Sequence, residues 1–434
     1  MGIGGIGVSA LARHYLADGY LVTGSDMSDS EILRELQDDG ALIYKNHQAE
    51  NVPSDAELVI YSAAVQKDNP ELKEAKKLDI KTLSYAEAIG ELTKKYFTIC
   101  ISGSHGKSTT TALIGLILTK AGYDPTIIVG TKLKELNNKN YRRGESQYLV
   151  LEADEWNKSF LGYHPKMIVL TNIDNEHLDT YKNFKGVVSG FNKYLQNLSE
   201  SGVLIANYKD RAIRDLGNKI SKKKDKTVIF YNKDKFKKHP LLIPGEYNQV
   251  NAEAAYQTAN FLGIKKDVTD SVFKEYSGAW RRMEFMGEST FVGKFVKSVK
   301  VFADYAHHPT EVRVTLKAFR EKYPDSNIVC VFEPHQADRL MRLFEDFIPV
   351  FAPVDMVILM PAYKVLGREE KKNNKKDAFA LAQEIKKRKK KVFYAPEFES
   401  AIKDVNNNLK SNSVVIFMGA GSIDGKMRKF LDVK

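Results

Sequence analysis

The segment at residues 99–111 carries the residue types that phosphate chemistry requires. An apolar stretch leads into Gly-Ser-His-Gly-Lys-Ser-Thr at residues 103–109, and a helical pattern follows directly. Glycines let backbone N–H groups close on phosphates, Lys107 can neutralise phosphate oxygens, and the Ser108 hydroxyl can reach Mg²⁺. Gly103 opens a loop shorter than the commonest phosphate-binding loop. The segment predicts a nucleoside triphosphate site, against the alternative of an ordinary strand-to-helix turn.

Acidic residues close two further apolar stretches in the middle of the chain. These ends carry Glu152, Asp154, Glu155 and Asp174, with His177 three residues later. Parallel strands bring their carboxyl ends to one edge of a sheet, where α/β proteins bind ligands. Oxygen ligands with one imidazole suit a Mg²⁺ ion that phosphates already hold. We therefore expect these side chains beside the phosphate loop, although a single carboxylate there could be a solvated strand end.

A second glycine pattern stands at the start of the chain. Gly2, Gly4 and Gly7 follow the spacing G-x-G-x-x-G, and Asp26 ends the next apolar stretch. Glycines at this spacing bring a diphosphate onto a helix N-terminus, and the acidic residue can meet a ribose. The pattern predicts a nucleotide-diphosphate site, with a structural glycine turn as the alternative. Such a turn normally follows a strand, so we expect the natural chain to begin upstream of Met1.

The C-terminal third carries a cluster of a different kind. Asp304, Tyr305, His307 and His308 follow one apolar stretch, and Arg339 comes shortly after another, close to His335. Three histidines with an acid and a guanidinium at strand ends are typical of a ligand site rather than of separate structural residues.

Two asparagines on a predicted helix carry side-chain amides that could bind a nucleotide base. Asn248 and Asn251 lie on the first turns of a helical stretch. Their amides could read the edge of a nucleotide base, whereas helix capping accounts for one asparagine more readily than for two.

Alternating strands and helices must position all of these residues. Apolar runs bounded by turn residues predict a parallel α/β arrangement in three blocks. The expected strands lie at residues 20–26, 58–62, 80–83, 99–102, 148–155, 167–174, 301–303, 328–332, 356–360, 392–394 and 414–417. The expected helices start near residues 8, 109, 246, 309 and 337.

Composition narrows the class of protein further. The chain has 434 residues, 43% of them hydrophobic, which is enough for two or three cores, and we expect three domains. Cys100 and Cys330 both stand in apolar runs, so a disulfide framework or thiolate metal site is excluded, and a cytoplasmic protein is expected. No apolar run is long enough to span a membrane.

The net charge of +11 suits polyanionic substrates as well as nucleic acid. The lysine runs at residues 371–376 and 386–391 lack interleaved aromatics, so nucleic-acid contact is not expected.

Seven motifs, taken in order, resemble the Mur ligases of peptidoglycan synthesis along the whole chain. They begin at residues 2, 103, 152, 171, 251, 304 and 419. The run His-His-Pro-Thr-Glu at residues 307–311, with the N-terminal glycines, is most similar to the alanine-adding members. The resemblance implies an N-terminal Rossmann-like domain for a UDP-sugar (1–92, its first strand missing). A central P-loop ATPase domain (93–280) and a C-terminal Rossmann-like domain for the amino acid and ATP (281–434) would follow.

The resemblance also implies an activity, namely ATP-dependent ligation of L-alanine to UDP-N-acetylmuramate through an acyl phosphate. By this resemblance the catalytic residues are Lys107, Glu152, His177, His307 and Arg339. Mg²⁺ would be held by Ser108, Glu152 and His177. ATP would meet Gly103, Ser104, His105, Gly106, Lys107, Ser108, Thr109, Asn248, Asn251, Arg282 and Asp304. The sugar nucleotide and amino acid would meet Gly4, Gly5, Ile6, Gly7, Asp26, Ser62, Tyr305, His307 and Arg339.

Three positions depart from the family pattern. Gln336 replaces an arginine expected near the amino-acid carboxylate, Tyr247 replaces a histidine, and residues 156–158 replace an acidic and serine-containing run. The neutral amide of glutamine lacks the positive charge with which a guanidinium binds a carboxylate through two hydrogen bonds. A ligase for another amino acid or a recycled peptide, and an inactive nucleotide-binding relative, therefore remain as alternatives. An NAD-dependent oxidoreductase would leave the triphosphate loop unexplained. We expect a monomer or weak homodimer that binds neither nucleic acid nor membrane.

Overall fold

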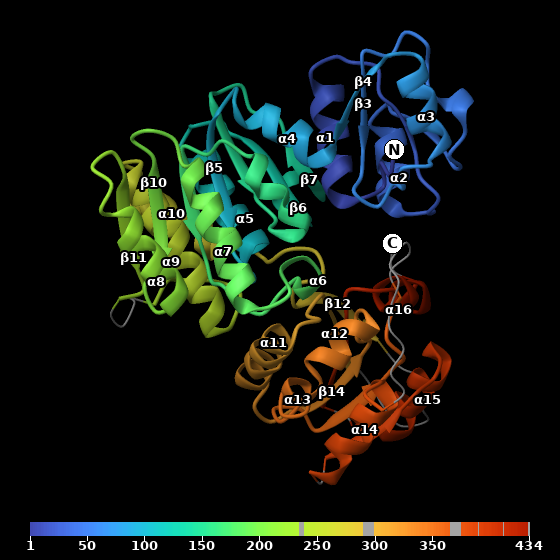
Figure 1. Cartoon of the computed structure of the whole chain (residues 1–434). Coiled ribbons are helices and arrows are strands. Elements are labelled where there is room, and N and C mark those ends of the chain that lie inside the picture. Colours follow the sequence, from blue (N-terminus) through green and yellow to red (C-terminus); the bar gives the residue numbers. More distant parts are fainter. Residues whose placement is uncertain (234–237, 290–298, 365–374, 389, 411, 433–434) are drawn as a thin grey trace. The chain divides into compact units, whose positions relative to one another are not determined.

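The computed structural model describes residues 1–233, 238–289, 299–364, 375–388, 390–410 and 412–432. Contacts divide the chain into two compact units (Figure 1). The first unit comprises residues 1–242 and 248–277, and the second comprises residues 243–247 and 278–434. No helix of the described ranges is long and apolar enough to cross a membrane. The predicted lysine runs fall partly outside the described residues, at positions 371–374 and 389.

The N-terminal part of the first unit carries two separate parallel two-stranded sheets instead of the single small sheet that we expect from the sequence. Strands β1 and β2 form one, and β3 and β4 form the other. No strand of the described residues pairs with both β1 and β3 to join the two sheets. The first residues of the chain nevertheless hydrogen-bond to both ends: Gly2 N–H donates to Ser25 O at 2.8 Å, and Ser62 N–H donates to Met1 O at 3.1 Å. The bounds are β1 Thr23–Ser25, β2 Leu42–Tyr44, β3 Leu58–Tyr61, β4 Lys81–Ser84, α1 Ile6–Ala17, α2 Glu31–Asp38, η1 Ala49–Asn51, α3 Pro70–Lys77 and α4 Tyr85–Thr93.

The rest of the first unit is built on a seven-stranded sheet in the order β11-β10-β9-β5-β8-β6-β7. All neighbours are parallel except β6 and β7, which are antiparallel. Strand β5, which leads into the phosphate loop, is central. The strands are β5 Phe97–Ser102, β6 Thr126–Leu133, β7 Lys139–Arg142, β8 Tyr148–Glu152, β9 Met167–Leu170, β10 Val203–Asn207 and β11 Thr227–Tyr231.

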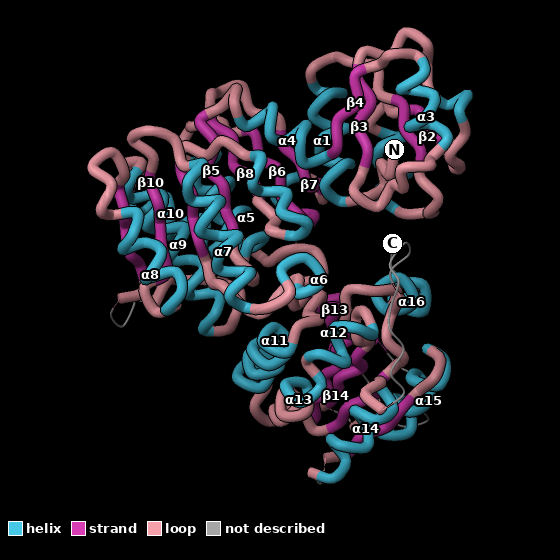
Figure 2. Tube along the Cα trace, viewed as in Figure 1, coloured by secondary structure: helices cyan, strands magenta, loops and turns pink. Residues whose placement is uncertain are grey.

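Helices cover both faces of this sheet (Figure 2). Side chains of α7 and α8 share a core with one face, and α5 packs on β6 and β8 with α10 against it. The helices are α5 Lys107–Lys120, η2 Lys134–Leu136, η3 Trp156–Gly162, α6 Leu178–Tyr181, α7 Phe184–Tyr194, η4 Leu195–Asn197, α8 Arg211–Ile220, α9 Glu246–Phe261 and α10 Lys266–Glu275.

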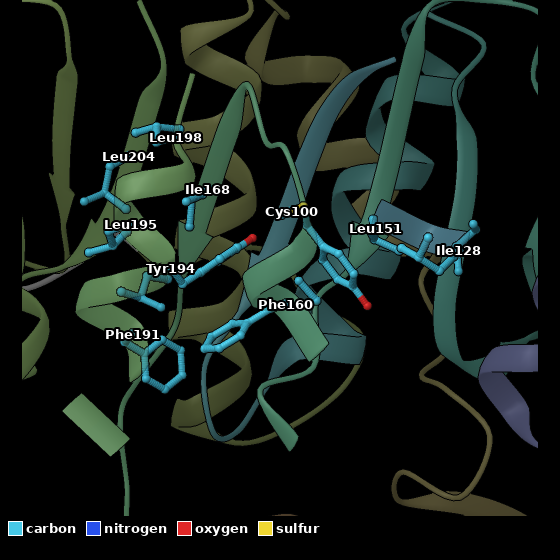
Figure 3. Packing of buried hydrophobic residues seen from close by; sticks show 14 of the residues in the cluster. Cys100, Ile128, Leu151, Phe160, Ile168, Phe191, Tyr194, Leu195, Leu198 and Leu204 are labelled. Atoms are coloured by element: carbon cyan, nitrogen blue, oxygen red, sulfur yellow. The ribbon is translucent and has the colours of Figure 1, made fainter. Parts of the chain in front are cut away.

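Aromatic packing fixes strand β5 from one side (Figure 3). Cys100 of β5 is fully buried in the same cluster as Phe160, whose ring stacks on Tyr194 at 4.4 Å and meets Phe191 edge-on at 5.3 Å. Cys100 and Cys330 are both free and buried, which confirms that they form no disulfide. Because interiors are close-packed, this cluster holds the strand that presents the phosphate loop.

The second unit is a six-stranded sheet in the order β12-β13-β17-β14-β15-β16, parallel except for β12 against β13. Helices α11, α13 and α14 share a core with one face, and α15 and α16 share a core with the other. The bounds are β12 Glu284–Ser289, β13 Val299–Asp304, α11 Pro309–Lys322, β14 Asn327–Phe332, α12 Ala337–Arg342, α13 Phe344–Phe347, β15 Met356–Leu359, α14 Ala378–Lys387, β16 Lys391–Tyr394, α15 Phe398–Asn408, β17 Ser413–Met418 and α16 Ile423–Leu431.

The expected α/β class with mostly parallel sheets is confirmed. The expected strand at residues 20–26 is shorter than predicted, since only Thr23–Ser25 pairs. The two antiparallel edge pairs, β6 with β7 and β12 with β13, were not anticipated by the parallel pattern. The boundaries at residues 92 and 280 stay a prediction.

Candidate active site

Two glycines shape the turn between β5 and α5. Gly103 has φ of 133° and Gly106 has φ of 82°, a backbone region that favours glycine. A Cβ atom on Gly103 would lie 2.2 Å from Thr171 Oγ1, and one on Gly106 would lie 2.3 Å from Asn251 Oδ1. Any side chain at either position would therefore collide with the surrounding structure. Gly106 directly precedes the first turn of α5, whose N–H groups can bind an anion.

The residues after β9 hold the loop in place. Ser104 N–H donates to Asn172 O at 2.9 Å, and His105 N–H donates to the Asn172 side chain at 2.8 Å. Thr171 Oγ1 and Asn172 Nδ2 both donate to His105 O, at 2.7 and 2.9 Å. His105 Nε2 lies 3.0 Å from Asp174 Oδ2. The neighbouring strand thus preorganises the loop through both backbone and side-chain groups, a rigid support for binding.

Lys107 is held by acceptors of its own loop and by one carboxylate. Its Nζ donates to Gly103 O at 2.6 Å and to Glu155 Oε2 at 2.9 Å, and lies 3.9 Å from Asp154 Oδ1. Burial favours the neutral amine, but the carboxylates of Glu155, Asp154 and Glu152 outweigh burial and raise the pKa of Lys107. The lysine is therefore a fixed positive charge at the phosphate loop.

Glu152 lies on the other side of the loop, at the end of β8. Its Oε1 accepts from Ser108 Oγ at 3.0 Å, and its Oε2 accepts from Gly130 N–H at 2.8 Å. Burial raises the pKa of Glu152, while Lys107 and these two hydrogen bonds oppose that rise. Ser108 and Glu152, which the family resemblance pairs as magnesium ligands, are thus in direct contact.

Glu155 is the carboxylate that meets both Lys107 and His177. Its side chain is completely buried, and its Oε1 lies 3.8 Å from His177 Nε2. Burial raises the pKa of Glu155, and Lys107 opposes that rise. Asp154, Glu155 and His177 each offer one ligand atom, and these atoms lie within 4.8 Å of one another. The expected gathering of acids and imidazole at this edge is confirmed, with Glu155 in the more central position.

One of the two asparagines of α9 contacts the phosphate loop, and the other lies next to it. Asn251 packs closely on Gly106, where there is no room for a Cβ atom, and its Nδ2 is 3.5 Å from Asn248 Oδ1. Both side chains are buried. Asn251 is therefore placed beside the phosphate loop, and Asn248 is next to it.

The N-terminal glycine turn and Asp26 are joined directly. Gly4 N–H donates to Asp26 Oδ2 at 2.9 Å, while Ser28 N–H donates to Asp26 Oδ1 at 2.9 Å. A Cβ on Gly7 would lie 2.8 Å from the Tyr85 ring, and one on Gly2 would lie 2.9 Å from Ser62 Cβ. The helix α1 begins at Ile6, after the N-cap Gly5, without a side-chain cap. This helix N-terminus is the expected anion site of the first block.

Aromatic rings and cations gather at the strand ends of the second unit. The Tyr305 and His307 ring centroids lie 5.2 Å apart, His307 and His335 lie 5.5 Å apart, and His335 stacks on Tyr363 at 5.7 Å. Arg339 lies 3.2 Å from His335 Nδ1. His308 has a structural role instead, because it is the N-cap residue of α11 and its ring accepts a hydrogen bond from Thr310 N–H.

Arg282 and Asp304 are the remaining sequence candidates in this unit. The Arg282 guanidinium lies 5.1 Å from the Tyr305 ring centroid and 3.5 Å from Glu311. Asp304 accepts from Met283 N–H and Ala306 N–H, both at 2.8 Å, one at each oxygen. Burial raises its pKa to about 6, although Arg282 and the two N–H groups favour the charged form. Asp304 therefore joins its own turn to the segment that carries Met283.

The sequence assigns no role to two residues that anchor the phosphate loop, and it places Glu155 beside the loop without giving it one. Asn172 and Thr171 anchor the phosphate loop, and Glu155 contacts Lys107 more closely than the acid predicted to be catalytic, Glu152. A signal for them exists in the sequence, since each lies at the end of a strand adjacent to β5 in the sheet. Spacing along the chain does not reveal which of two neighbouring acids turns toward the lysine.

A central parallel strand, a glycine-bracketed loop and a helix, with acids on both adjacent strand ends, define a nucleotide-binding α/β protein of the P-loop class. Family models resolve the class further. The Mur ligase family, catalytic domain, matches residues 1–97, the Mur ligase middle domain matches residues 101–262, and the Mur ligase, glutamate ligase domain, matches residues 281–421. The chain belongs to the Mur ligase family.

Curated relatives and solved structures agree with this assignment. The chain is 35% identical to UDP-N-acetylmuramate--L-alanine ligase of Aquifex aeolicus, across 99% of this chain and 96% of that protein. It is 36% identical to the ligase of the same name from Alkaliphilus metalliredigens, across 98% and 94%. The crystal structure of UDP-N-acetylmuramate-alanine ligase from Thermotoga maritima matches with a TM-score of 0.81 at 25% identity, covering 99% and 97%. A murein peptide ligase from Psychrobacter arcticus shares the fold, with a TM-score of 0.71 at 19% identity, covering 99% and 97%.

Proposed function

We propose that this protein joins L-alanine to the lactate carboxylate of UDP-N-acetylmuramate, with hydrolysis of ATP, in the synthesis of peptidoglycan precursors. The observation that carries the proposal is the preorganised phosphate loop, in which Lys107 contacts the buried Glu155 and Ser108 contacts Glu152. Family membership and the named relatives support the choice of substrates. The three predicted domains would bring the sugar nucleotide, ATP and the amino acid.

The chemistry requires activation of the carboxylate before an amine can react with it. A muramyl carboxylate oxygen attacks the γ-phosphorus, the bond to the β-phosphate oxygen breaks, and ADP leaves. The alanine amine then attacks the acyl carbon, loses a proton, and releases phosphate through a tetrahedral intermediate. Lys107 is proposed to balance the charge on the transferring phosphoryl group. Gly103, Ser104, His105, Gly106 and Thr109 would enclose the phosphates, and Asn251 would approach the adenine side with Asn248.

The donor set at the β8 edge fits a magnesium ion. Ser108 and Glu152 are already in contact, and His177 stands beside the buried oxygen of Glu155, which accepts no hydrogen bond from the described residues. Oxygen donors with one imidazole suit this hard cation when phosphates complete its shell. When bound, Mg²⁺ reduces the repulsion between the two anions that must meet. Glu152→Gln should raise the Mg²⁺ concentration needed for half-maximal rate, and an unchanged requirement would remove Glu152 as a ligand.

The second unit is proposed to bind the amino acid and part of the nucleotide. Tyr305, His307 and Arg339 lie in one cluster with His335 and would contact the alanine and the new bond. Arg282, against the Tyr305 ring, would contact ATP. Asp304 would act near the ribose, although both of its oxygens accept backbone N–H groups in this structure. Gly4, Gly5, Ile6, Gly7, Asp26 and Ser62 would bind the sugar nucleotide.

One experiment tests the function. The full chain is incubated with UDP-N-acetylmuramate, ATP, Mg²⁺ and each amino acid in turn, or with the muropeptide tripeptide, and products are identified by mass spectrometry. We expect a product larger by one alanine residue, with equal amounts of ADP and phosphate. A product only with the tripeptide would favour a recycling ligase, and ATP turnover independent of both cosubstrates would contradict the proposal. The no-alanine reaction is the control for background ATP hydrolysis.

A further inference from the structure

Tyr363 follows β15 and lies face to face with a histidine of the aromatic cluster in the second unit. Its ring centroid is 5.7 Å from that of His335, and the two rings are inclined by only 14°. Strand β15 is parallel to β14, so the segments that follow the two strands meet at one edge of the sheet. Tyr363 therefore reaches the cluster from a strand that carries none of its other members.

Backbone hydrogen bonds fix the segment of Tyr363 against that of His335. Tyr363 N–H donates to Pro334 O at 2.7 Å, and Gln336 N–H donates to Tyr363 O at 3.0 Å. These two bonds form an isolated parallel bridge between His335 and Tyr363. Residues that pair across strands present their side chains on the same face, so the backbone itself brings the two rings together.

The turn after β17 closes in on Tyr363 as well. A Cβ atom on Gly421 would lie 2.5 Å from Tyr363 Cβ and would also collide with Glu333 Oε2. Glu333 is 3% exposed and accepts from Ser422 Oγ at 2.8 Å and from Ile423 N–H at 3.1 Å. Because these contacts hold the turn in place, Tyr363 has little room to move away from His335.

His335 itself is held from two further directions. Arg339 Nη1 lies 3.2 Å from His335 Nδ1. A guanidinium can only donate, so Nδ1 accepts this hydrogen bond and the proton of the neutral ring is on Nε2. The His307 ring meets His335 edge-on, with centroids 5.5 Å apart. The orientation of His335 therefore bears on the two residues proposed to contact alanine, His307 and Arg339.

We infer that Tyr363 is a positioning residue of the amino-acid site, which stacks on His335 and fixes the plane in which this imidazole meets Arg339 and His307. The inference rests on the proposed function for the identity of the amino acid, whereas the position of the ring does not depend on it. Tyr363 acts through His335 rather than on the substrate. Without the stack, the imidazole can rotate, and its Nδ1 no longer faces the guanidinium in one fixed arrangement.

The first test compares Tyr363→Leu with Tyr363→Phe, which keeps the ring and loses only the hydroxyl. Proton–nitrogen correlation spectra of the full chain with isotope-labelled histidine report the surroundings and the tautomer of each imidazole without any substrate. The His335 signal is the one missing from His335→Gln. We expect the same signal, with the proton on Nε2, in the wild type and in Tyr363→Phe. Tyr363→Leu should show a shifted His335 signal with mixed tautomers.

Steady-state rates give the second readout. Tyr363→Leu should raise the KM for L-alanine by about two- to tenfold, the range that one aromatic pair contributes, and leave the KM for ATP unchanged. Tyr363→Phe should keep both constants. Tyr394→Leu is the control for loss of a tyrosine from the same sheet, since Tyr394 ends β16 and its ring meets Phe379 instead. This control should keep the His335 signal and both constants.

Three results overturn the positioning role: an unshifted His335 signal in Tyr363→Leu, the same alanine KM in Tyr363→Leu and Tyr363→Phe, or an equal rise in the KM for ATP. If Tyr363→Leu does not fold, Gly421→Ala decides, because its new Cβ must displace Tyr363. A shifted His335 signal with a raised alanine KM then supports the role, and wild-type values overturn it. A wild type that shows the expected His335 signal but forms no ligation product would remove the proposed function and retain the ring arrangement.

Discussion

Lys107 shows how the surroundings of one residue set its task. Burial alone would favour a neutral amine, but three carboxylates keep the charge, and two carbonyl groups and Glu155 fix the position of Nζ. A charge fixed before substrate arrives requires little reorganisation when the phosphoryl group transfers. We therefore propose that Lys107 serves the reaction rather than the stability of α5.

Lys107→Ala should reduce kcat by about 10²–10³-fold, the usual effect of removing one preorganised electrostatic group. Steady-state kinetics with saturating alanine and UDP-N-acetylmuramate measure the change. Lys120→Ala provides the control, since Lys120 lies in the last turn of the same helix and pairs with Glu275 at the surface. A Lys107→Ala enzyme with more than about a tenth of the wild-type rate would contradict the phosphate assignment.

Gln336→Arg should lower the KM for L-alanine and leave the KM for ATP unchanged. Gln336 has φ of 70° and precedes α12, which carries Arg339. A guanidinium here adds a charge-assisted partner for the amino-acid carboxylate, worth about 1.5–3 kcal/mol where geometry allows. Initial rates at varied alanine measure the change, with Gln336→Lys as the control for charge without the bidentate fork. An unaltered KM in both variants would mean that another cation already binds the carboxylate.

The raised pKa of Asp304 predicts that the free energy of unfolding depends on pH. Its pKa is raised to about 6 by burial, whereas aspartates of an unfolded chain titrate near about 3.9. Between these values the folded state binds the extra proton, so stability should fall as pH rises from about 4 to about 6, by at most about 3 kcal/mol. Asp304→Asn should lose this slope in calorimetric melting, while Asp325→Asn at an exposed site should retain it. Identical profiles for wild type and Asp304→Asn would exclude the raised pKa.

At the scale of elements, a buried polar network fastens α1 to β7 within the first unit. Arg13, 4% exposed, contacts Glu35 and Asp39 at 2.8 Å each and donates to Asn140 Oδ1 at 2.5 Å. Asn140 Nδ2 donates in turn to Ile6 O and Ser9 Oγ at the first turn of α1. The helix of the glycine turn is thereby tied to the edge strand of the central sheet.

Arg13→Ala should destabilise the protein by about 2–4 kcal/mol, because Asn140 and two carboxylates lose a buried partner. Denaturant unfolding measures the change, and the affinity for UDP-N-acetylmuramate should fall with it as the helix N-terminus loosens. Arg34→Ala is the matched control, since this arginine is 68% exposed and lies 3.6 Å from Asp29. A loss below about 0.5 kcal/mol, the range of ordinary surface changes, would show that the network adds little.

At the scale of the whole molecule, the residues proposed for ATP come from both units. Lys107 and Asn251 belong to the first, and Arg282 and Asp304 belong to the second. Enzymes that bind one substrate through two bodies commonly close around it and exclude water.

Saturating ADP, Mg²⁺ and UDP-N-acetylmuramate should reduce the radius of gyration measured by small-angle X-ray scattering. UDP alone serves as the control, because it engages only the predicted N-terminal domain. The same samples test the predicted monomer or weak homodimer through their forward scattering. A radius that does not change with the full set of ligands would contradict closure.

The α/β class, the glycine-bracketed loop and the polar residues at the strand ends are predictable from the sequence. The loop is predictable because its strand, glycines, lysine and helix are adjacent along the chain, although residues after β9 hold it in place in the fold. The meeting of the polar ends of β8 and β9 is also predictable, because parallel strands bring their carboxyl ends to one edge of the sheet.

Which of these residues meet depends instead on contacts between distant parts of the chain. Glu152 and Glu155 are both acids after the same strand, yet the turn that follows β8 aims Glu155 at Lys107 and His177 and leaves Glu152 with Ser108. Both oxygens of Asp304 accept backbone N–H groups that no spacing indicates. The pairing of β7 with β6 and the burial of Arg13 likewise follow from the folded arrangement. Packing and hydrogen bonding across the fold determine these directions, and such interactions are absent from any local pattern.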